Sequence, residues 1–530
     1  MKKIILHLKI LLIGFSVTTF AQQNNVLIII ADDLGVDYMS TYEEGSDFAS
    51  TPNINELSAT GIQFNNAWSN PVCSPTRAGI LTGRYGFRTG ITNVVGGRNG
   101  GQGINTEEFT LPDVIKTSLS GYANACIGKW HLSDDTNGGD DNPNLMGFDY
   151  YSGLLTGASN YFEWNKTTNG ITVTVSNYAT SENVDDAIRW IDQQAGPWFQ
   201  WLAFTNPHTP FHLPPVELHS FDNLSGSFRD IRTRPIPYFK AMVEAMDTEI
   251  GRLFQHLKQT GQFDNTNIIF IGDNGTTEQV VQAPFDPNRS KTTLYEGGVN
   301  VPMIISGPAI NSGGRQSNAL INTLDIFATS LDLMGINTLN TIPSNIIIDS
   351  KSLLPIIKNE STSVRNWVFS ELSGLNEQSD GKTIRNTTFK LIRFDNGIEE
   401  FYNLNNDPFE NNNLLSQTLS ANAQNNYIEL SDQLNQLTGA TNISNTTVRD
   451  DRFIDVQIYP NPSSEQITIS AFDEVGTFKY NIVDIYGNIV ISGSSDNKIK
   501  IVSLTEIDPA LYFIEIEFDK KKIIKRFLKK

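Results

Sequence analysis

The stretch Val26-Leu27-Ile28-Ile29-Ile30, followed directly by Ala31-Asp32-Asp33, decides the fold class. Five consecutive apolar, mostly β-branched residues predict a strand buried on both faces, which is typical of a parallel sheet covered by helices. In open α/β sheets, ligands bind beyond the carboxyl ends of such strands. Asp32 and Asp33 lie at that position. Their oxygens suit a hard cation, although an aspartate there is also an ordinary helix N-cap.

A second strand repeats this pattern further along the chain. Asn267-Ile268-Ile269-Phe270-Ile271 is an apolar run that ends in Gly272-Asp273-Asn274-Gly275. The two strands together place four side chains with oxygen ligands at strand ends. We therefore expect Asp32, Asp33, Asp273 and Asn274 to form a cage for a hard metal ion, open on one side to a substrate oxygen.

One of only two cysteines lies in Cys73-Ser74-Pro75-Thr76-Arg77, which continues to Leu81-Thr82-Gly83. Pro75 predicts a tight turn at Cys73, followed by a short helix over residues 78–81. The start of such a helix suits an anionic ligand, and Arg77 adds a fork of donors that matches sulfate or phosphate oxygens. The alternative is that Cys73 is a small buried hydrophobic residue. Cys126 lies in another predicted strand, and we expect no disulfide between the two.

Further histidines and lysines follow predicted strands. In Gly128-Lys129-Trp130-His131, Lys129 and His131 are two residues apart, so in an extended chain both face one pocket. His208 lies in Asn206-Pro207-His208-Thr209-Pro210 after the strand 198–204, and Lys291 precedes Glu296-Gly297-Gly298. Each of these residues, taken alone, is also compatible with an ordinary surface position.

Composition limits the possible partners. The 530 residues carry a formal charge of −19, and this lack of a basic surplus argues against nucleic acid. An acidic protein binds an anionic substrate only through a local basic pocket or a metal ion. Residues 1–21 predict a secretory signal peptide, with an N-terminal anchor helix as the alternative. No other stretch approaches the length of a transmembrane helix.

The chain divides into four predicted parts. After the signal peptide, residues 22–345 predict a catalytic α/β domain with a large mixed, mostly parallel sheet flanked by helices. Residues 346–445 predict a smaller α+β subdomain, with a hairpin around Asp395-Asn396-Gly397. Residues 446–530 predict a small all-β tail domain. Its pattern alone fits a glycan-binding module as well as a sorting tag.

Taken together, residues 24–440 resemble the sulfatases of the alkaline-phosphatase-like superfamily. The resemblance rests on motifs in the family's order: Cys73-Ser74-Pro75-Thr76-Arg77, Gly128-Lys129-Trp130-His131, Pro207-His208-Thr209-Pro210, Gly272-Asp273-Asn274-Gly275 and Lys291 before Glu296-Gly297-Gly298. It implies the alkaline-phosphatase-like fold. It also implies that Cys73 is converted after translation to formylglycine, whose hydrate is the nucleophile.

The resemblance further implies a role for each site residue. One Ca²⁺ ion is held by Asp32, Asp33, Asp273, Asn274 and the converted Cys73. Arg77 and Lys129 steady the nucleophile and the sulfate, and His131 takes the proton from the second hydroxyl of the hydrate. His208 and Lys291 lie on the side of the leaving group. A formylglycine-generating or anaerobic sulfatase-maturing enzyme is then a required partner.

The tail resembles the C-terminal sorting domain of the type IX secretion system of Bacteroidetes. The residues that carry this likeness are Ile458-Tyr459-Pro460-Asn461-Pro462, Asp484-Ile485-Tyr486-Gly487 and Leu511-Tyr512-Phe513. It implies export through the periplasm by the type IX machinery, to the cell surface or the medium. A sulfated polysaccharide is then the expected substrate, with an algal glycan such as ulvan or a carrageenan favoured over host glycosaminoglycans.

Two other functions remain open at this point. One is hydrolysis of phosphate or phosphonate monoesters, which other members of the superfamily catalyse, some of them also with formylglycine. The other is a non-catalytic surface protein that binds glycans and keeps Cys73 as a thiol. Four arginines, Arg84, Arg88, Arg98 and Arg289, lie in or near loops expected to set specificity, as candidates for contacts with further anionic groups.

Overall fold

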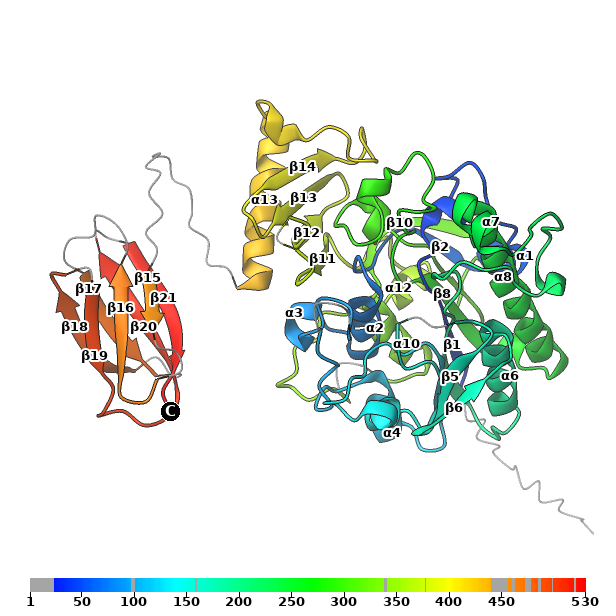
Figure 1. Ribbon diagram of the computed structural model, residues 1–530, viewed down its shortest axis with the longest axis horizontal. Helices are drawn as coiled ribbons and strands as arrows, with labels where there is room; N and C mark the ends of the chain where they lie inside the picture. Colours follow the sequence, from blue (N-terminus) through cyan, green and yellow to red (C-terminus); the bar gives the residue numbers. More distant parts are fainter. Residues whose placement is uncertain are drawn as a thin grey trace, which may run out of the picture. The chain divides into compact units, whose positions relative to one another are not determined.

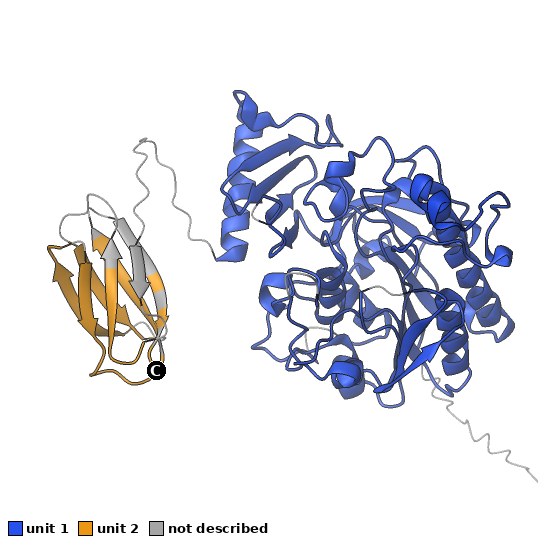
Figure 2. Cartoon of the chain, in the orientation of Figure 1, with its two compact units in different colours: residues 1–442 blue, residues 443–530 orange. Residues whose placement is uncertain are grey.

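The computed structural model describes residues 23–96, 101–157, 160–337, 341–376 and 378–439, and in the tail 456–459, 463–471, 478–484, 488–497, 499–518 and 521–530. The chain forms two compact units, residues 1–442 and 443–530 (Figure 2). The expected signal peptide, residues 1–21, lies outside the described residues. None of the helices in the described ranges is long and apolar enough to cross a membrane.

Ten strands of the described chain form the central sheet of the first unit, in the order β10-β2-β9-β8-β1-β7-β3-β4-β5-β6 (Figure 1). β1 pairs in parallel with β7 and β8, β3 with β7 and β4, and β2 with β10, whereas β9 runs antiparallel to β8 and β2. The expected large mixed, mostly parallel sheet is therefore confirmed. The strands are β1 (Asn25–Ala31), β2 (Ile62–Trp68), β3 (Ala123–Gly128), β4 (Tyr150–Gly153), β5 (Trp164–Thr168), β6 (Ile171–Val175), β7 (Trp198–Ala203), β8 (Thr266–Gly272), β9 (Met303–Ser306) and β10 (Arg315–Asn322).

Helices cover both faces of this sheet (Figure 1). The described helices before residue 368 are α1 (Pro52–Thr60), α2 (Cys73–Thr82), α3 (Gly86–Thr89), α4 (Leu111–Ser118), α5 (Asn142–Leu145), α6 (Ala179–Ile191), α7 (Phe228–Thr233), α8 (Pro235–Gln259), α9 (Glu296–Val299), α10 (Asp325–Leu333) and α12 (Leu354–Ile357). Short 3-10 segments are η1 (Val36–Tyr38), η2 (Gly139–Asp141), η3 (Val216–Leu218), η4 (Phe263–Asn265) and η5 (Pro287–Arg289).

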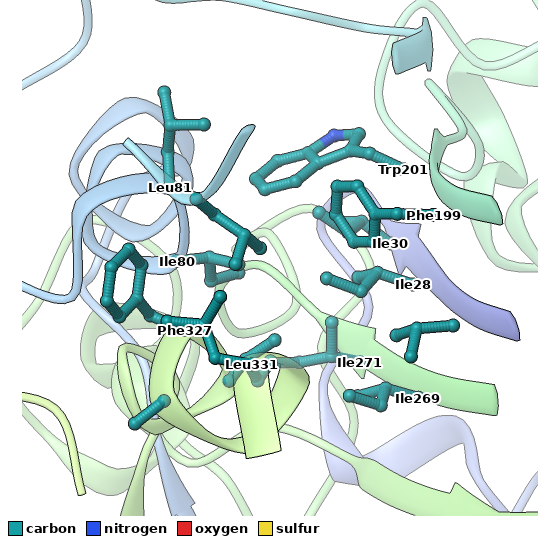
Figure 3. Packing of buried hydrophobic residues seen from close by; sticks show 14 of the residues in the cluster. Ile28, Ile30, Ile80, Leu81, Phe199, Trp201, Ile269, Ile271, Phe327 and Leu331 are labelled. Atoms are coloured by element: carbon teal, nitrogen blue, oxygen red, sulfur yellow. The ribbon is translucent and has the colours of Figure 1, made fainter. Parts of the chain in front are cut away.

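Alternation along β1 builds two cores from one apolar run. Val26, Ile28 and Ile30 face the helices α2, α4 and α10, while Leu27 and Ile29 face α1, α6 and α8. Figure 3 shows the first of these cores, in which Ile28 and Ile30 lie beside residues of β7 and β8 and opposite α2 and α10. Because all five residues are fully buried, β1 is fixed between the two layers, and so are the residues at its end.

The parallel strands bring their carboxyl ends to one edge of the sheet. Ala31 of β1 pairs with Gly272 of β8, and Gly128 of β3 pairs with Ala203 of β7. The residues that follow these four positions therefore emerge side by side. This register, rather than proximity in the sequence, assembles the site.

A second sheet in the first unit has the order β11-β12-β13-β14 and is antiparallel. Its strands are β11 (Val368–Leu372), β12 (Gly381–Arg385), β13 (Phe389–Phe394) and β14 (Glu399–Asn403), followed by η6 (Leu414–Ser416) and α13 (Ala421–Thr438). Leu430 and Leu434 of α13 belong to the same buried cluster as Leu391 and Phe401 of the sheet. The predicted hairpin joins β13 and β14.

The second unit consists of two antiparallel sheets, β15-β16-β19 and β18-β17-β20-β21. Their strands are β15 (Val456–Tyr459), β16 (Gln466–Ala471), β17 (Phe478–Val483), β18 (Ile489–Ser495), β19 (Ile499–Ser503), β20 (Leu511–Phe518) and β21 (Lys521–Leu528). One core contains Ile467 and Ile469 from the first sheet and Ile482 and Ile514 from the second. The tail is therefore a small all-β sandwich, as expected.

Three elements differ from the sequence-based expectation. β10 was not predicted, because its first half alternates between partly buried and exposed residues and resembles a surface loop. The sequence pattern predicts a helix over residues 322–333, but this helix, α10, begins at Asp325, since Asn322 still belongs to β10. The turn expected at Cys73 is absent, because α2 begins at Cys73 itself.

Candidate active site

Cys73 is the first residue of α2 and is 1% exposed. Pro75 fits within the first helical turn, because backbone N–H groups there need no helical acceptor. Burial raises the pKa of the Cys73 thiol to about 11, even though the charge of Lys129 acts to lower it. The unmodified thiol is thus held protonated, in a state poorly suited to nucleophilic attack.

Four side-chain oxygen ligands meet beside Cys73. Asp32 and Asp33 follow β1, and Asp273 and Asn274 follow β8. The backbone N–H of Asp33 donates to Asp273 Oδ1 at 3.1 Å, and Asn274 Nδ2 donates to Asp33 Oδ1 at 2.9 Å. Ligand atoms of Asp32, Asp33 and Cys73 lie within 4.8 Å of one another.

This set fits a hard cation. Asp32 Oδ1 and Asn274 Oδ1 are buried without a hydrogen-bond partner in the described part of the chain, which is costly unless a ligand satisfies them. Burial and the neighbouring charge of Asp32 raise the pKa of Asp273 to about 6. A divalent cation bound among these oxygens would supply the missing partner and hold the carboxylates ionised.

Three buried or nearly buried cations surround the same point. Arg77 donates from Nε and Nη2 to Asp273 Oδ2, at 3.1 and 2.8 Å, and from Nη1 to the carbonyl of Lys129 at 2.8 Å. Lys129 Nζ donates to Asp32 Oδ2 and lies 3.6 Å from Cys73 Sγ. Lys291 Nζ lies 2.6 Å from Asp33 Oδ1. Three cations therefore face the three carboxylates.

His131 reaches the site by an unexpected backbone path. Its φ is 60°, so the extended conformation assumed from the spacing with Lys129 is wrong for this segment. The imidazole is accommodated because residue 157 is glycine: a Cβ there would lie 2.5 Å from the ring. Ser74 Oγ donates to the His131 carbonyl at 2.8 Å, which links the histidine to α2. Burial, with the charges of Lys129 and Arg77, lowers the pKa of His131 well below its ordinary value.

His208 lies on the loop that follows β7, beside Asp33. Its Nδ1 donates to the Thr209 carbonyl at 2.6 Å, and its Nε2 lies 3.7 Å from Asp33 Oδ2. Burial lowers the pKa of His208 to about 4, although Asp33 acts to raise it. Tyr161 holds this loop from behind, since its hydroxyl lies 2.8 Å from the carbonyl of Thr205 and 2.7 Å from that of His208.

The structure brings together every candidate site residue taken from the sequence: Asp32, Asp33, Cys73, Arg77, Lys129, His131, His208, Asp273, Asn274 and Lys291. Sequence reasoning missed Ser74 and Tyr161, which position the two histidines. Ser74 lies inside the cysteine motif, so its position in the sequence could have identified it as a site residue. Tyr161 lies in a polar loop with no such signal.

Three of the other four candidate arginines have structural partners. Arg84 pairs with Glu108, and Arg88 pairs with Asp349. Arg289 lies over the ring of Tyr295 and donates to the Glu410 carbonyl. Arg98 lies outside the described residues. Cys73 and Cys126 are both free, and both are buried, whereas the sequence placed Cys73 on a turn.

Comparison with known proteins places this site in a family. A family model described as Sulfatase matches residues 24–336, one described as N-sulphoglucosamine sulphohydrolase, C-terminal, matches residues 288–439, and one described as Secretion system C-terminal sorting domain matches residues 457–530. The last match supports the sorting-tag interpretation of the tail and implies a secreted or cell-surface protein.

Individual proteins agree with the family model. An uncharacterized sulfatase of Escherichia coli is 28% identical, and the N-acetylgalactosamine-6-sulfatase of Rattus norvegicus is 29% identical. Each alignment spans 63% of this chain and 66% of the relative, so the chain covers just under two thirds of their length. The solved structure of Ps i-CgsB in complex with k-i-k-neocarrahexaose matches with a TM-score of 0.67 and 25% identity, over 79% of this chain and 94% of that one.

The sulfatase model spans more than half of the 530 residues, and the matched segment carries the strand ends, the Cys73 helix and the three cations described above. The chain therefore belongs to the sulfatase family.

Proposed function

We propose that this protein hydrolyses sulfate monoesters on a sulfated polysaccharide or its oligosaccharides and releases inorganic sulfate. The observation that carries the proposal is the enclosure of Cys73, at the start of a helix, by metal-type oxygens and three cations. Such an arrangement suits a group that attacks an anionic centre.

The nucleophile in this proposal is not the thiol. Cys73 is converted to formylglycine by a formylglycine-generating or anaerobic sulfatase-maturing enzyme. The hydrated aldehyde supplies two hydroxyls, one that displaces the alcohol from sulfur and one whose deprotonation then releases sulfate. The raised pKa of the Cys73 thiol favours this interpretation over direct attack by sulfur.

One Ca²⁺ ion is proposed at Asp32, Asp33, Asp273 and Asn274, together with the converted side chain of residue 73. Calcium suits a site made of carboxylate and amide oxygens, and it would supply Lewis-acid polarisation of a sulfate oxygen. The charges of Asp32, Asp33 and Asp273 are already matched by Arg77, Lys129 and Lys291. A divalent cation thus leaves an excess of positive charge, which suits an anionic substrate.

The protein's own residues then divide the work. Arg77 and Lys129 orient residue 73 and bind the sulfate oxygens. His131, whose Nδ1 is buried without a partner in the described chain, accepts the proton from the second hydroxyl. Lys291, near Asp33, donates the proton to the departing alcohol oxygen, and His208 does so only in its protonated form, which the charge of Asp33 favours.

The substrate class is inferred from the relatives and from the tail. The rat relative is named for N-acetylgalactosamine 6-sulfate, and the structural relative holds a neocarrahexaose. With a sorting domain on residues 457–530, we infer that the enzyme leaves the periplasm through type IX secretion and acts outside the cell. We therefore propose an algal glycan, with a carrageenan or ulvan first, ahead of glycosaminoglycans.

Three measurements test this proposal. The intact mass of the peptide that contains residue 73 should show an aldehyde rather than a thiol. Cys73→Ala should lower turnover by about 10³-fold or more while the fold is kept, whereas Cys126→Ala, the matched control at the other buried cysteine, should keep turnover. Full activity of Cys73→Ala would contradict the proposed formylglycine mechanism. Faster turnover of a phosphate ester than of its sulfate analogue would instead favour the alternative function, hydrolysis of phosphate or phosphonate esters.

A further inference from the structure

A cavity in the first unit uses none of the residues described above as catalytic or metal-binding. It has a volume of about 470 Å³, within the range of roughly 300–1,000 Å³ that is typical of ligand sites. Its walls come from β2 and β10 at one edge of the central sheet, from the loop after η1, and from the loops beside β12 and β14. The cavity therefore lies where the two sheets of the unit meet.

Side-chain amides dominate the wall of this cavity. They come from Gln63, Asn65, Asn66, Asn300, Gln316, Asn318 and Asn405. Gln63 Nε2 donates to Asn65 Oδ1 at 3.1 Å, and Asn65 Nδ2 donates to Asn318 Oδ1 at 2.8 Å. These bonds fix the orientation of the Gln63, Asn65 and Asn318 amides, so this part of the wall presents an ordered set of donors and acceptors. An amide offers both at once, which matches the hydroxyl groups of a sugar.

Two buried polar atoms on this wall lack partners. Thr41 Oγ1 and Asn300 Oδ1 have no hydrogen-bond partner within the described ranges, although both atoms are shielded from solvent. Buried polar groups in folded proteins are normally hydrogen-bonded. A ligand in the cavity reaches these two oxygens only if the side chain of Thr41 or Asn300 turns toward it.

The charge of the cavity excludes an anionic ligand. Glu43, Glu44 and Glu296 line it, and among the described residues that line it Arg385 is the single cation. Arg385 donates to Glu296 Oε2 at 3.0 Å, so its charge is already matched. A sulfated or phosphorylated group would meet the carboxylates of Glu43 and Glu44, which form no ion pair within the described part of the chain, in contrast to the cation-rich site at Cys73.

An apolar patch completes the cavity. The rings of Phe285 and Phe409 pack edge to face, with centroids 5.2 Å apart, and Pro408 and Tyr42 also line the cavity. An aromatic surface beside hydrogen-bonding groups accommodates both the apolar face and the hydroxyls of a pyranose. Phe285 also belongs to the segment between Asn274 and Lys291, which connects this wall to the candidate active site.

We propose that this cavity is a binding site for neutral sugar residues, separate from the site at Cys73. It binds unsulfated parts of a glycan through the amide wall formed by Gln63, Asn65 and Asn318. If the proposed sulfatase function holds, the site raises the local concentration of polysaccharide near residue 73. The binding itself does not depend on that function.

The test is saturation-transfer difference NMR and titration of the full-length protein with neutral hexasaccharides: neoagarohexaose, cellohexaose, mannohexaose and xylohexaose. At least one should bind. Asn65→Leu combined with Asn318→Leu should weaken that binding roughly 10- to 100-fold, the cost of about two ordinary hydrogen bonds. Asn165→Leu, on the exposed part of β5, is the matched control and should bind as the parent does.

Two further readouts separate the possible failures. Circular dichroism melting of the double variant checks its fold, and its turnover of 4-methylumbelliferyl sulfate should equal that of the parent. Absence of turnover in the parent would count against the proposed function and leave the sugar site standing. Failure of all four hexasaccharides to bind, or equal binding by a folded double variant, would overturn the sugar site.

Discussion

Replacing Lys390 by methionine should destabilise the first unit more than any surface charge substitution. Lys390 on β13 is fully buried, and its Nζ lies 3.1 Å from Glu296 Oε1 and 2.8 Å from Glu410 Oε1. Glu296 begins α9, five residues after Lys291, and Glu410 accepts the backbone N–H of Glu296 at 2.6 Å. This ion cluster thus holds the segment that carries Lys291 against the second sheet.

The expected cost follows from burial. At an effective dielectric constant of about 20, each ion pair at this distance has a gross attraction of about 5 kcal/mol. Desolvation of the three ions offsets much of this, but the share of that cost that belongs to the two glutamates remains when the lysine is removed. Glu296 retains Arg385 at 3.0 Å, whereas Glu410 loses its cation. We therefore expect a loss of about 3–5 kcal/mol in the free energy of unfolding.

Tryptophan fluorescence during urea unfolding is the appropriate assay, because all seven tryptophans lie before residue 368 and report on the first unit alone. Lys382→Met is the matched control: Lys382 is one-third exposed, lies 3.8 Å from Asp395, and should cost about 0–1 kcal/mol. Adding Glu410→Gln to Lys390→Met should recover part of the loss. The reasoning is refuted if Lys390→Met costs no more than Lys382→Met.

Three further outcomes are expected. Burial raises the pKa of Glu371 to about 7, so the folded state binds an extra proton between about pH 4.5 and 7 and stability falls as the pH rises through that window. Between pH 5 and pH 8, the free energy of unfolding should fall by up to about 3 kcal/mol more in the parent than in Glu371→Gln. Urea unfolding of both proteins at the two pH values measures this difference. Chelation by EGTA should abolish turnover and lower the melting temperature, and Ca²⁺ rather than Mg²⁺ should restore both. Tyr161→Phe should lower kcat on the order of tenfold and make it depend more steeply on the acidity of the leaving group, with an unchanged melting temperature separating this effect from unfolding.

Much of the candidate site was predictable because it is built on strand ends. Apolar runs such as Val26 to Ile30 are unambiguous, and parallel strands in register bring the residues after them to one edge. Asp32 and Asp273 are therefore neighbours although 241 positions separate them in the sequence. The cysteine motif then identified Cys73 as a further residue of the site at this edge of the sheet.

The parts of the fold and the site that could not be predicted depend on contacts between distant segments, which no local sequence pattern records. The left-handed backbone at His131 is possible because Gly157, from a different loop, leaves room for the ring. β10 is half exposed, so its apolar signal is weak, and its place is set by pairing with β2. The amide-lined cavity arises only where two sheets meet, so its residues are scattered from Thr41 to Phe409.

Cys73 is enclosed by the fold together with Ser74 and Pro75, which are buried in the same helix. Under the proposed chemistry, a second enzyme must bind this segment and oxidise its thiol, and the folded chain offers neither the segment nor the sulfur. Under this proposal, Cys73 is therefore oxidised before α2 packs into the fold, while the chain is being made or exported. Activity is then decided once in the life of each molecule, since a chain that folds with its thiol intact stays inactive for as long as it stays folded.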